Sequence, residues 1–196
     1  MTRSKQQEHE AAFRLRNDVC VRVVQDTTKV DGLGGEVWAG ALVLCEFLET
    51  HDQEVVRERD VIELGAGCGL CGLVAASLGA KTTVLTDEFP DLLARNIAKN
   101  QHIWEEREAD GSSAIVSSGE LEWGVAESIV PFAHKFDTML GTAAKQTGFT
   151  VHKHPSVRLA TREAVTTLVG ALGRPLHVDE DDWSVVFELR LERTDQ

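Results

Sequence analysis

The stretch Asp60-Val-Ile-Glu-Leu-Gly-Ala-Gly-Cys-Gly-Leu-Cys-Gly-Leu73 decides the fold of this 196-residue chain. It starts with apolar residues that predict a short buried strand at 61–64. Glycines then open a predicted helix at 70–78, which Gly79 ends. A strand, a glycine-rich turn and a helix in this order are typical of the first half of a βαβ unit. The stretch therefore predicts a parallel sheet with covering helices.

Further elements continue this alternation on both sides of the stretch. The sequence predicts strands at 19–25, 81–86, 115–116 and 136–140, and helices at 37–49 and 90–100. We therefore expect an α/β fold, a Rossmann-like and parallel-rich sheet with helices on both faces and a shortened C-terminal part. Residues 1–18 are expected to form a flexible arm, and residues 19–196 a single domain.

Composition and charge disfavour several classes of protein. The formal net charge is −12, which disfavours nucleic acid as a partner and suits a basic protein segment or a cationic small molecule. The chain has no run of 18 apolar residues, so we expect no membrane span, and residues 1–10 lack the apolar core of a secretory signal. Four cysteines are too few for a disulfide framework in a chain this long, which favours a reducing compartment. We expect a cytoplasmic monomer, with the nucleus as the alternative location.

Cys68 and Cys71 form a C-x-x-C, a spacing that redox and metal sites share. A zinc site needs about four ligands, and the sequence offers no second cysteine pair to complete one. A thioredoxin-like motif is an alternative, because a C-x-x-C can open a helix. The surrounding glycines already explain the segment. We therefore interpret the two cysteines as small residues at a tight turn and helix start, and we predict no metal site.

The glycines match the spacing of a nucleotide-binding loop. Gly67, Gly69 and Gly72 form G-x-G-x-x-G, and Asp87 lies 20 residues after Gly67 at the end of a predicted strand. An acidic residue at that place hydrogen-bonds ribose hydroxyls in dinucleotide-binding sheets. The alternative for Asp87 is a turn or N-cap aspartate before Pro90. Because the strand, the helix and the acid occupy their expected positions, we predict a cofactor role for the loop and for Asp87.

Glu63 separates two classes of cofactor. It lies directly before the loop, where a pyrophosphate would be repelled by its carboxylate by a few kcal/mol at an effective dielectric constant of about 20. S-adenosylmethionine carries an ammonium and a sulfonium and has no phosphate, so a nearby carboxylate favours it over NAD. The alternative for Glu63 is a carboxylate that accepts hydrogen bonds from the loop's own amide groups.

Five segments in order then carry a specific resemblance. They are EVWAGALVLCEFLE (36–49), VIELGAGCGLCGLVAASLGA (61–80), VLTDEFPDLLARNIAKN (84–100), LEWG (121–124) and FDTMLG (136–141). Together they resemble the seven-strand, S-adenosylmethionine-dependent protein lysine methyltransferases of the methyltransferase-like family 16. The resemblance implies a class I methyltransferase fold and a protein substrate. Members of this family methylate lysines on chaperones, on the valosin-containing ATPase and on translation elongation factors.

The resemblance also implies which residues contact the cofactor. These are Trp38 on the helix before the sheet, Glu63, Gly65, Gly67 and Gly69 at the methionine end, Asp87 at the ribose, and Trp123 beside the adenine. From composition alone, core anchors are an equal alternative for the two tryptophans. Asn96 and Asn100 lie one helical turn apart, and we expect them on a solvated face outside the site.

The resemblance ends after Gly141. The family pattern implies an acid and a tyrosine beyond this point, whereas this chain has Ala143 and Gln146 in their places and contains no tyrosine. Methyl transfer needs a neutral amine, which for a lysine of pKa about 10.4 costs about 4.6 kcal/mol at pH 7. The missing pair would help to shape the lysine pocket, so we assign no catalytic residue. Two alternatives to a lysine methyltransferase remain: a catalytically impaired pseudoenzyme that binds S-adenosylmethionine or a protein, and an NAD-dependent oxidoreductase.

Overall fold

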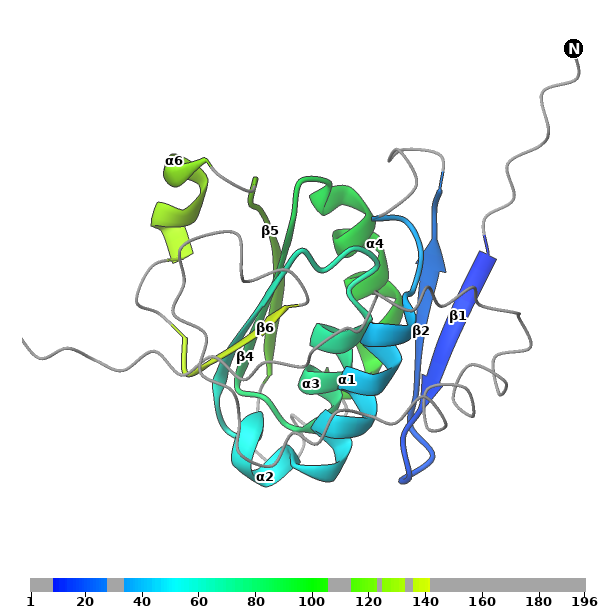
Figure 1. Cartoon of the computed structure of the whole chain (residues 1–196). Helices are drawn as coiled ribbons and strands as arrows, with labels where there is room; N and C mark the ends of the chain where they lie inside the picture. The colour runs from blue at the N-terminus through cyan, green and yellow to red at the C-terminus, as the bar shows by residue number, and fades with distance from the viewer. Residues whose placement is uncertain (1–8, 28–33, 106–113, 123–124, 133–135, 142–196) are drawn as a thin grey trace, which may run out of the picture.

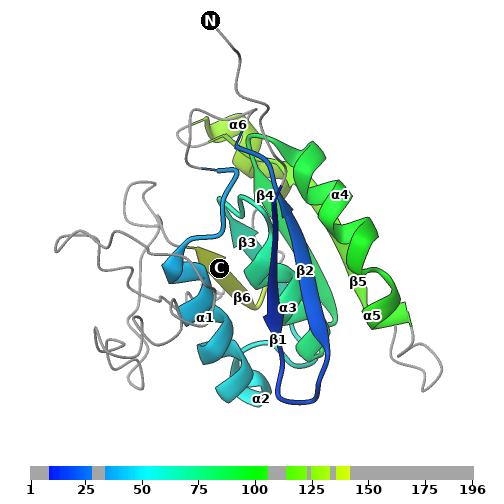
Figure 2. The same ribbon diagram turned by 90° about the vertical axis from the view of Figure 1, so that its right-hand side faces the viewer.

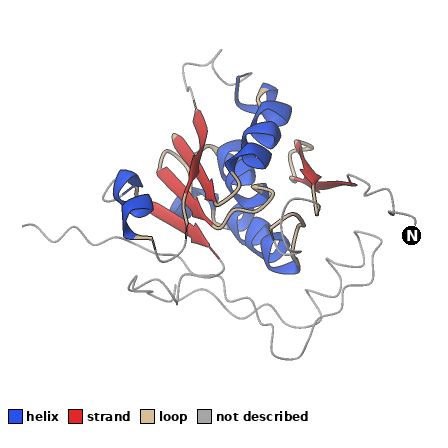
Figure 3. Ribbon diagram, turned by 90° about the horizontal axis from the view of Figure 1, so that it is seen from above, coloured by secondary structure: helices blue, strands red, loops and turns tan. Residues whose placement is uncertain are grey.

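The structure is a computed structural model that describes residues 9–27, 34–105, 114–122, 125–132 and 136–141. Its elements are stacked in layers, which Figure 3 shows from above: a short helical segment, a parallel sheet, a layer of longer helices and a two-stranded hairpin. No helix in these ranges is long and apolar enough to cross a membrane.

The central sheet has the strand order β5-β4-β3-β6, and all of its neighbouring strands are parallel. The strands are β3 (Asp60–Leu64), β4 (Thr82–Asp87), β5 (Ile115–Glu120) and β6 (Thr138–Gly141). From β3 the chain continues to β4 and β5 on one side, and then returns to place β6 on the other side of β3. The strand order therefore reverses at β3, and the carboxyl end of β3 is where such sheets bind ligands. The predicted α/β fold with a parallel sheet is confirmed.

Helices cover both faces of this sheet (Figure 1). They are α1 (Ala39–Thr50), α2 (Asp52–Val55), α3 (Leu70–Leu78), α4 (Pro90–Asn100), α5 (His102–Glu105) and α6 (Ala126–Ile129), followed by the 3₁₀ helix η2 (Val130–Phe132). The two crossover helices, α3 and α4, lie on one face, and α6 lies on the other. Gly79 ends α3 in the left-handed conformation, as predicted, and Pro90 starts α4.

The core lies mainly between the sheet and α3. Every residue of α3 is buried, because α1 packs on one side of this helix and the sheet on the other. A helix that is apolar all round is expected in such a place. Strand β3 alternates accordingly: Val61 belongs to this larger core, whereas Ile62 and Leu64 pack with Met139 in a smaller cluster on the other face of the sheet.

The hairpin of β1 (His9–Arg14) and β2 (Cys20–Gln25) corrects one expectation. The two strands pair antiparallel, so His9–Arg14 is part of a hairpin, and the expectation of a flexible arm over residues 1–18 is wrong for His9–Arg14. Figure 1 and Figure 2 show the hairpin outside α3 and α4, and β2 contacts both helices. Phe13 explains why this segment packs on the domain. Its side chain is buried in the core, and the removal of this apolar surface from water favours the paired strand over a solvated arm.

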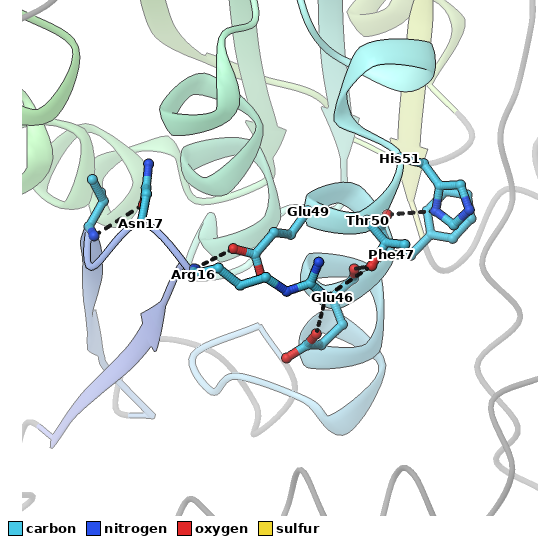
Figure 4. A network of polar contacts seen from close by, with 8 residues as sticks. Arg16, Asn17, Glu46, Phe47, Glu49, Thr50 and His51 are labelled. Atoms are coloured by element: carbon cyan, nitrogen blue, oxygen red, sulfur yellow. Dashed lines mark hydrogen bonds and ion pairs between the residues drawn. The ribbon is translucent and has the colours of Figure 1, made fainter.

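The loop that connects β1 to β2 makes polar contacts with α1 (Figure 4). The backbone N–H of Arg16 donates to the carboxylate of Glu49, and the guanidinium of Arg16 donates to Thr50 Oγ1 at 3.2 Å. The same guanidinium lies 3.7 Å from Glu46 and 3.6 Å from Glu49 in ion pairs. Because the Arg16 side chain is largely exposed, each ion pair contributes little individually. Together they give the hairpin a defined place against α1.

Asn96 and Asn100 overturn a second expectation. Both were predicted on a solvated face, but their side chains are 0% and 1% exposed. They replace a neighbouring strand along the edge of β2 that faces away from β1. Asn96 Oδ1 accepts from Val24 N–H at 2.8 Å, and Asn100 Oδ1 accepts from Arg22 N–H at 2.9 Å. The reason is that β2 lies against α4, so this edge of its backbone needs partners that water does not supply.

Candidate functional site

Three glycines shape the turn between β3 and α3. Gly65, Gly67 and Gly69 have φ angles of 63°, 55° and 79°, in the left-handed region that side chains disfavour. At Gly67 a Cβ would also lie 2.9 Å from the carbonyl oxygen of Gly34. The backbone of Gly65 is exposed, whereas Gly69 is buried against the side chains of Leu85 and Leu93. All three predicted glycines therefore form one loop, whose open side is at Gly65.

Hydrogen bonds from β4 hold this loop over the end of the sheet. Ala66 N–H donates to the carbonyl of Thr86 at 2.9 Å, and Gly67 N–H donates to Asp87 Oδ2 at 2.9 Å. Gly69 N–H closes the turn by donating to the carbonyl of Ala66 at 2.7 Å. The loop and Asp87 are thus direct neighbours, as the 20-residue spacing between Gly67 and Asp87 predicts.

Asp87 lies at the carboxyl end of β4 with a partly exposed side chain. Its Oδ1 accepts from Phe89 N–H at 3.3 Å, a long contact that agrees with the alternative of a turn aspartate. Its carboxylate therefore already serves the protein through Gly67 and Phe89. Because the side chain is partly exposed, its carboxylate oxygens can still accept a hydrogen bond from a ligand hydroxyl. The contact between Asp87 and ribose stays a prediction.

Glu63 has a different environment from the one expected. Its side chain is 6% exposed, and Oε2 accepts from Gly72 N–H at 2.7 Å. This is the alternative weighed for Glu63, a carboxylate bonded to an amide of its own segment. Burial raises the pKa of Glu63 to about 8, opposed by the Gly72 hydrogen bond and assisted by the negative charge of Asp87. A contact between Glu63 and the cofactor stays a prediction.

Gly72, the last glycine of the G-x-G-x-x-G spacing, is explained by Glu63. A Cβ at Gly72 would lie 2.7 Å from Glu63 Oε2 and 2.8 Å from Leu85 Cγ. The first turn of α3 therefore approaches both strands as closely as a residue without a side chain allows. This matches the helix–strand packing role that the last glycine has in nucleotide-binding folds.

Trp38 lies at the N-terminal cap of α1 and is 47% exposed. The preceding Val37 N–H donates to Gln25 Oε1 at 2.8 Å, which ties this segment to the end of β2. The exposure argues against the alternative of a core anchor for Trp38. Trp123, the other predicted tryptophan, lies outside the described residues, and so do Ala143 and Gln146.

The two cysteines of the C-x-x-C are both buried. Burial raises the pKa of the Cys68 thiol to about 12. The pKa of Cys71 is also raised, first by the thiol of Cys45, whose Sγ lies 4.0 Å from Cys71 Sγ, and then by burial. Within the described ranges, no group of three or more potential metal ligands comes together. Both side chains belong to the same larger hydrophobic core.

A cleft of about 270 Å³, which the sequence does not predict, lies at the start of α4, directly after Asp87. Its lining combines four carboxylates with an exposed aromatic ring and one guanidinium: Asp26, Glu88, Phe89, Pro90, Asp91, Leu92, Arg95 and Glu120. These residues come from the residue after β2, the end of β5, the turn between β4 and α4, and α4 itself, so only the tertiary structure assembles them. The carboxylates make this cleft suited to a cationic group.

Comparisons with known proteins agree with one another. A family model described as lysine methyltransferase matches residues 16–143. The protein N-lysine methyltransferase METTL21A of Danio rerio is 39% identical over 140 residues, which cover 70% of this chain and 59% of that protein.

Shorter matches point to the same class of protein. The protein-lysine methyltransferase METTL21E of Mus musculus is 39% identical over 107 residues, covering 53% of this chain and 40% of the relative. The protein N-terminal and lysine N-methyltransferase efm7 of Neurospora crassa is 40% identical over 97 residues, covering 47% and 33%. The chain thus spans less than two thirds of the length of each of these relatives.

Proposed function

The chain belongs to the lysine methyltransferase family, and from this membership we propose that it binds S-adenosylmethionine at the glycine loop and methylates a lysine of a protein substrate. One observation carries the proposal. The loop of left-handed glycines and the carboxylate of Asp87 meet at the carboxyl end of β3, where the strand order reverses.

The residues present fit such a ligand. Gly65 is exposed, and Ala66 and Gly67 are partly exposed, so a ligand can approach the loop backbone without meeting a side chain larger than a methyl group. S-adenosylmethionine, when bound, supplies an electrophilic methyl group on a sulfonium. In this proposal Asp87, whose side chain is partly exposed, accepts from hydroxyl groups of the ligand, and Trp38, which is 47% exposed, packs against it.

Charge supports both a cationic cofactor and a basic substrate. The whole chain carries a formal charge of −12, and four carboxylates gather in the cleft after Asp87. Such a field raises the local concentration of lysine-rich segments and speeds their association at low salt. The relatives' names specify lysine as the modified residue. We propose a protein with a basic segment around the target lysine as the substrate class, and the chaperones, ATPases and translation factors that this family methylates as the first candidates.

Calorimetric titration with S-adenosylhomocysteine tests cofactor binding. We expect the wild-type protein to bind S-adenosylhomocysteine and not NADH. The Asp87→Asn variant keeps an oxygen that can accept from Gly67 N–H but loses the charge, and it should bind about tenfold more weakly, because charged hydrogen bonds to ligand hydroxyls contribute about 1.5–3 kcal/mol. Binding of NADH alone would contradict the proposal.

Transfer of a labelled methyl group tests the activity. Incubation of the wild-type protein with labelled S-adenosylmethionine and a cell extract should label discrete proteins on lysine, and the Asp87→Asn variant should label them less. Labelling equal to that of a heat-inactivated control, despite measurable cofactor binding, would identify a binding protein without this activity.

A further inference from the structure

Asn96 connects three parts of the molecule that are far apart in sequence. From α4, its Nδ2 donates to the carbonyl of Cys68 in the glycine loop at 2.9 Å and to the carbonyl of Val24 in β2 at 3.0 Å. Its Oδ1 accepts from Val24 N–H at 2.8 Å. The side chain is 0% exposed, so these bonds are shielded from competition by water.

The bond to Cys68 lies at the point where the loop most needs an external partner. Gly67 and Gly69 flank Cys68, and both have positive φ angles, so the local sequence favours no single backbone conformation there. The bonds at Ala66 and Gly67 come from β4, on the strand side of the loop. Asn96 adds a hydrogen bond to the loop from the α4 side. The loop is thereby fixed between β4 and α4.

The hydrogen bonds between Asn96 and Val24 connect α4 to β2, whose end contacts the segment on the opposite side of the loop. Gln25, the next residue of β2, accepts from the N–H before Trp38, and Asp26 N–H donates to the carbonyl of Gly35 at 3.0 Å. This places Gly34 directly over Gly67, where a Cβ would meet its carbonyl. The buried amide of Asn96 is therefore bonded directly to the loop and is connected, through β2, to the segment that carries Trp38.

We propose that Asn96 is a positioning residue for the cofactor: it holds the Gly67–Gly69 backbone and the β2 end in the arrangement that binds the ligand. The proposal rests on the proposed function. It predicts that a change at Asn96 weakens cofactor binding beyond what its effect on stability explains.

Asn100 provides a matched control. It lies one turn later on α4, is 1% exposed and makes the same paired contact to β2, with Arg22 N–H at 2.9 Å and the Arg22 carbonyl at 2.7 Å. Its remaining bond is to the carbonyl of Asn96, at 2.7 Å, and not to the glycine loop. Substitution by aspartate at either position keeps the acceptor for the strand N–H and removes both donated bonds.

The experiment compares Asn96→Asp with Asn100→Asp in the full chain. Urea denaturation measures stability, calorimetry measures the affinity for S-adenosylhomocysteine, and hydrogen exchange reports on the amides of residues 65–72. We expect similar losses of stability, affinity about tenfold lower for Asn96→Asp, affinity within about twofold of wild type for Asn100→Asp, and faster exchange in the loop only for Asn96→Asp.

Equal affinities for the two variants, or equal exchange in the loop, would overturn the proposal. If Asn96→Asp does not fold, Asn96→Ser and Asn100→Ser replace the pair, with the same expected difference. If the wild-type protein does not bind S-adenosylhomocysteine, the proposed function fails. The hydrogen-exchange comparison then still decides whether Asn96 holds the loop.

Discussion

The buried carboxyl of Glu63 predicts an unusual dependence of stability on pH. Its pKa rises from an ordinary value of 4.5 to about 8, mainly through burial. Between these two values the folded protein keeps the proton while the unfolded chain has lost it. Unfolding therefore releases a proton in this window, and the free energy of unfolding falls as the pH rises.

The size of the effect follows from the same two values. Each pH unit in the window corresponds to about 1.4 kcal/mol, so the full difference from 4.5 to about 8 amounts to about 5 kcal/mol. The contribution is fully present below pH 4.5 and is lost once the pH exceeds about 8. Since whole domains are stable by only about 5–15 kcal/mol, the effect is large enough to measure.

The Glu63→Gln variant isolates this group. A glutamine stays neutral at every pH, and its amide oxygen can still accept from Gly72 N–H. We expect the variant to match the wild type near pH 5 and to be more stable by several kcal/mol at pH 8. Urea denaturation from pH 5 to pH 8 at constant ionic strength gives the two curves.

A surface substitution serves as the control for replacing a glutamate by a glutamine. Glu54 is exposed on α2, so Glu54→Gln removes one titratable carboxyl group without changing a buried one. This variant should follow the wild-type curve. Parallel curves for wild type and Glu63→Gln would show that the Glu63 carboxyl is ionised in the folded protein below pH 8, and would refute the reasoning.

Two further predictions concern the glycine loop and Trp38. Gly69→Ala should lower the free energy of unfolding by about 3 kcal/mol, because the left-handed backbone disfavours a side chain and the new Cβ would lie 2.5 Å from Leu85 Cδ2. Urea denaturation measures this free energy, and a loss below about 1 kcal/mol would show that the loop adapts to the new side chain. Trp38→Ala should weaken binding of S-adenosylhomocysteine by about fivefold, through loss of an aromatic contact with the ligand. The thermal midpoint should change little, because Trp38 is 47% exposed. An unchanged affinity in calorimetry would place Trp38 outside the site.

The strand–turn–helix unit around the loop follows from local sequence. The apolar run before Gly65 and the apolar residues after Gly69 fit only a buried strand and a buried helix, and the positive φ angles between them require glycine. Because these constraints act over a few residues, β3, α3 and the neighbourhood of Asp87 could be predicted. Strand β5 was predicted at two residues and has six, because pairing with β4 extends it through the polar residues Ser117 and Ser118.

Contacts between distant segments decided the rest. The sequence does not show that Asn96 and Asn100 pair with β2, because the strand lies 72 and 78 residues away from them along the chain. Nor does it show that Glu63 turns toward Gly72, since a carboxylate after a strand fits a ligand and a helix amide equally well. Local pattern thus determined which backbone forms the site. Only the tertiary structure decided where each polar side chain finds its partner, because a buried polar group must be paired with whatever the fold brings next to it.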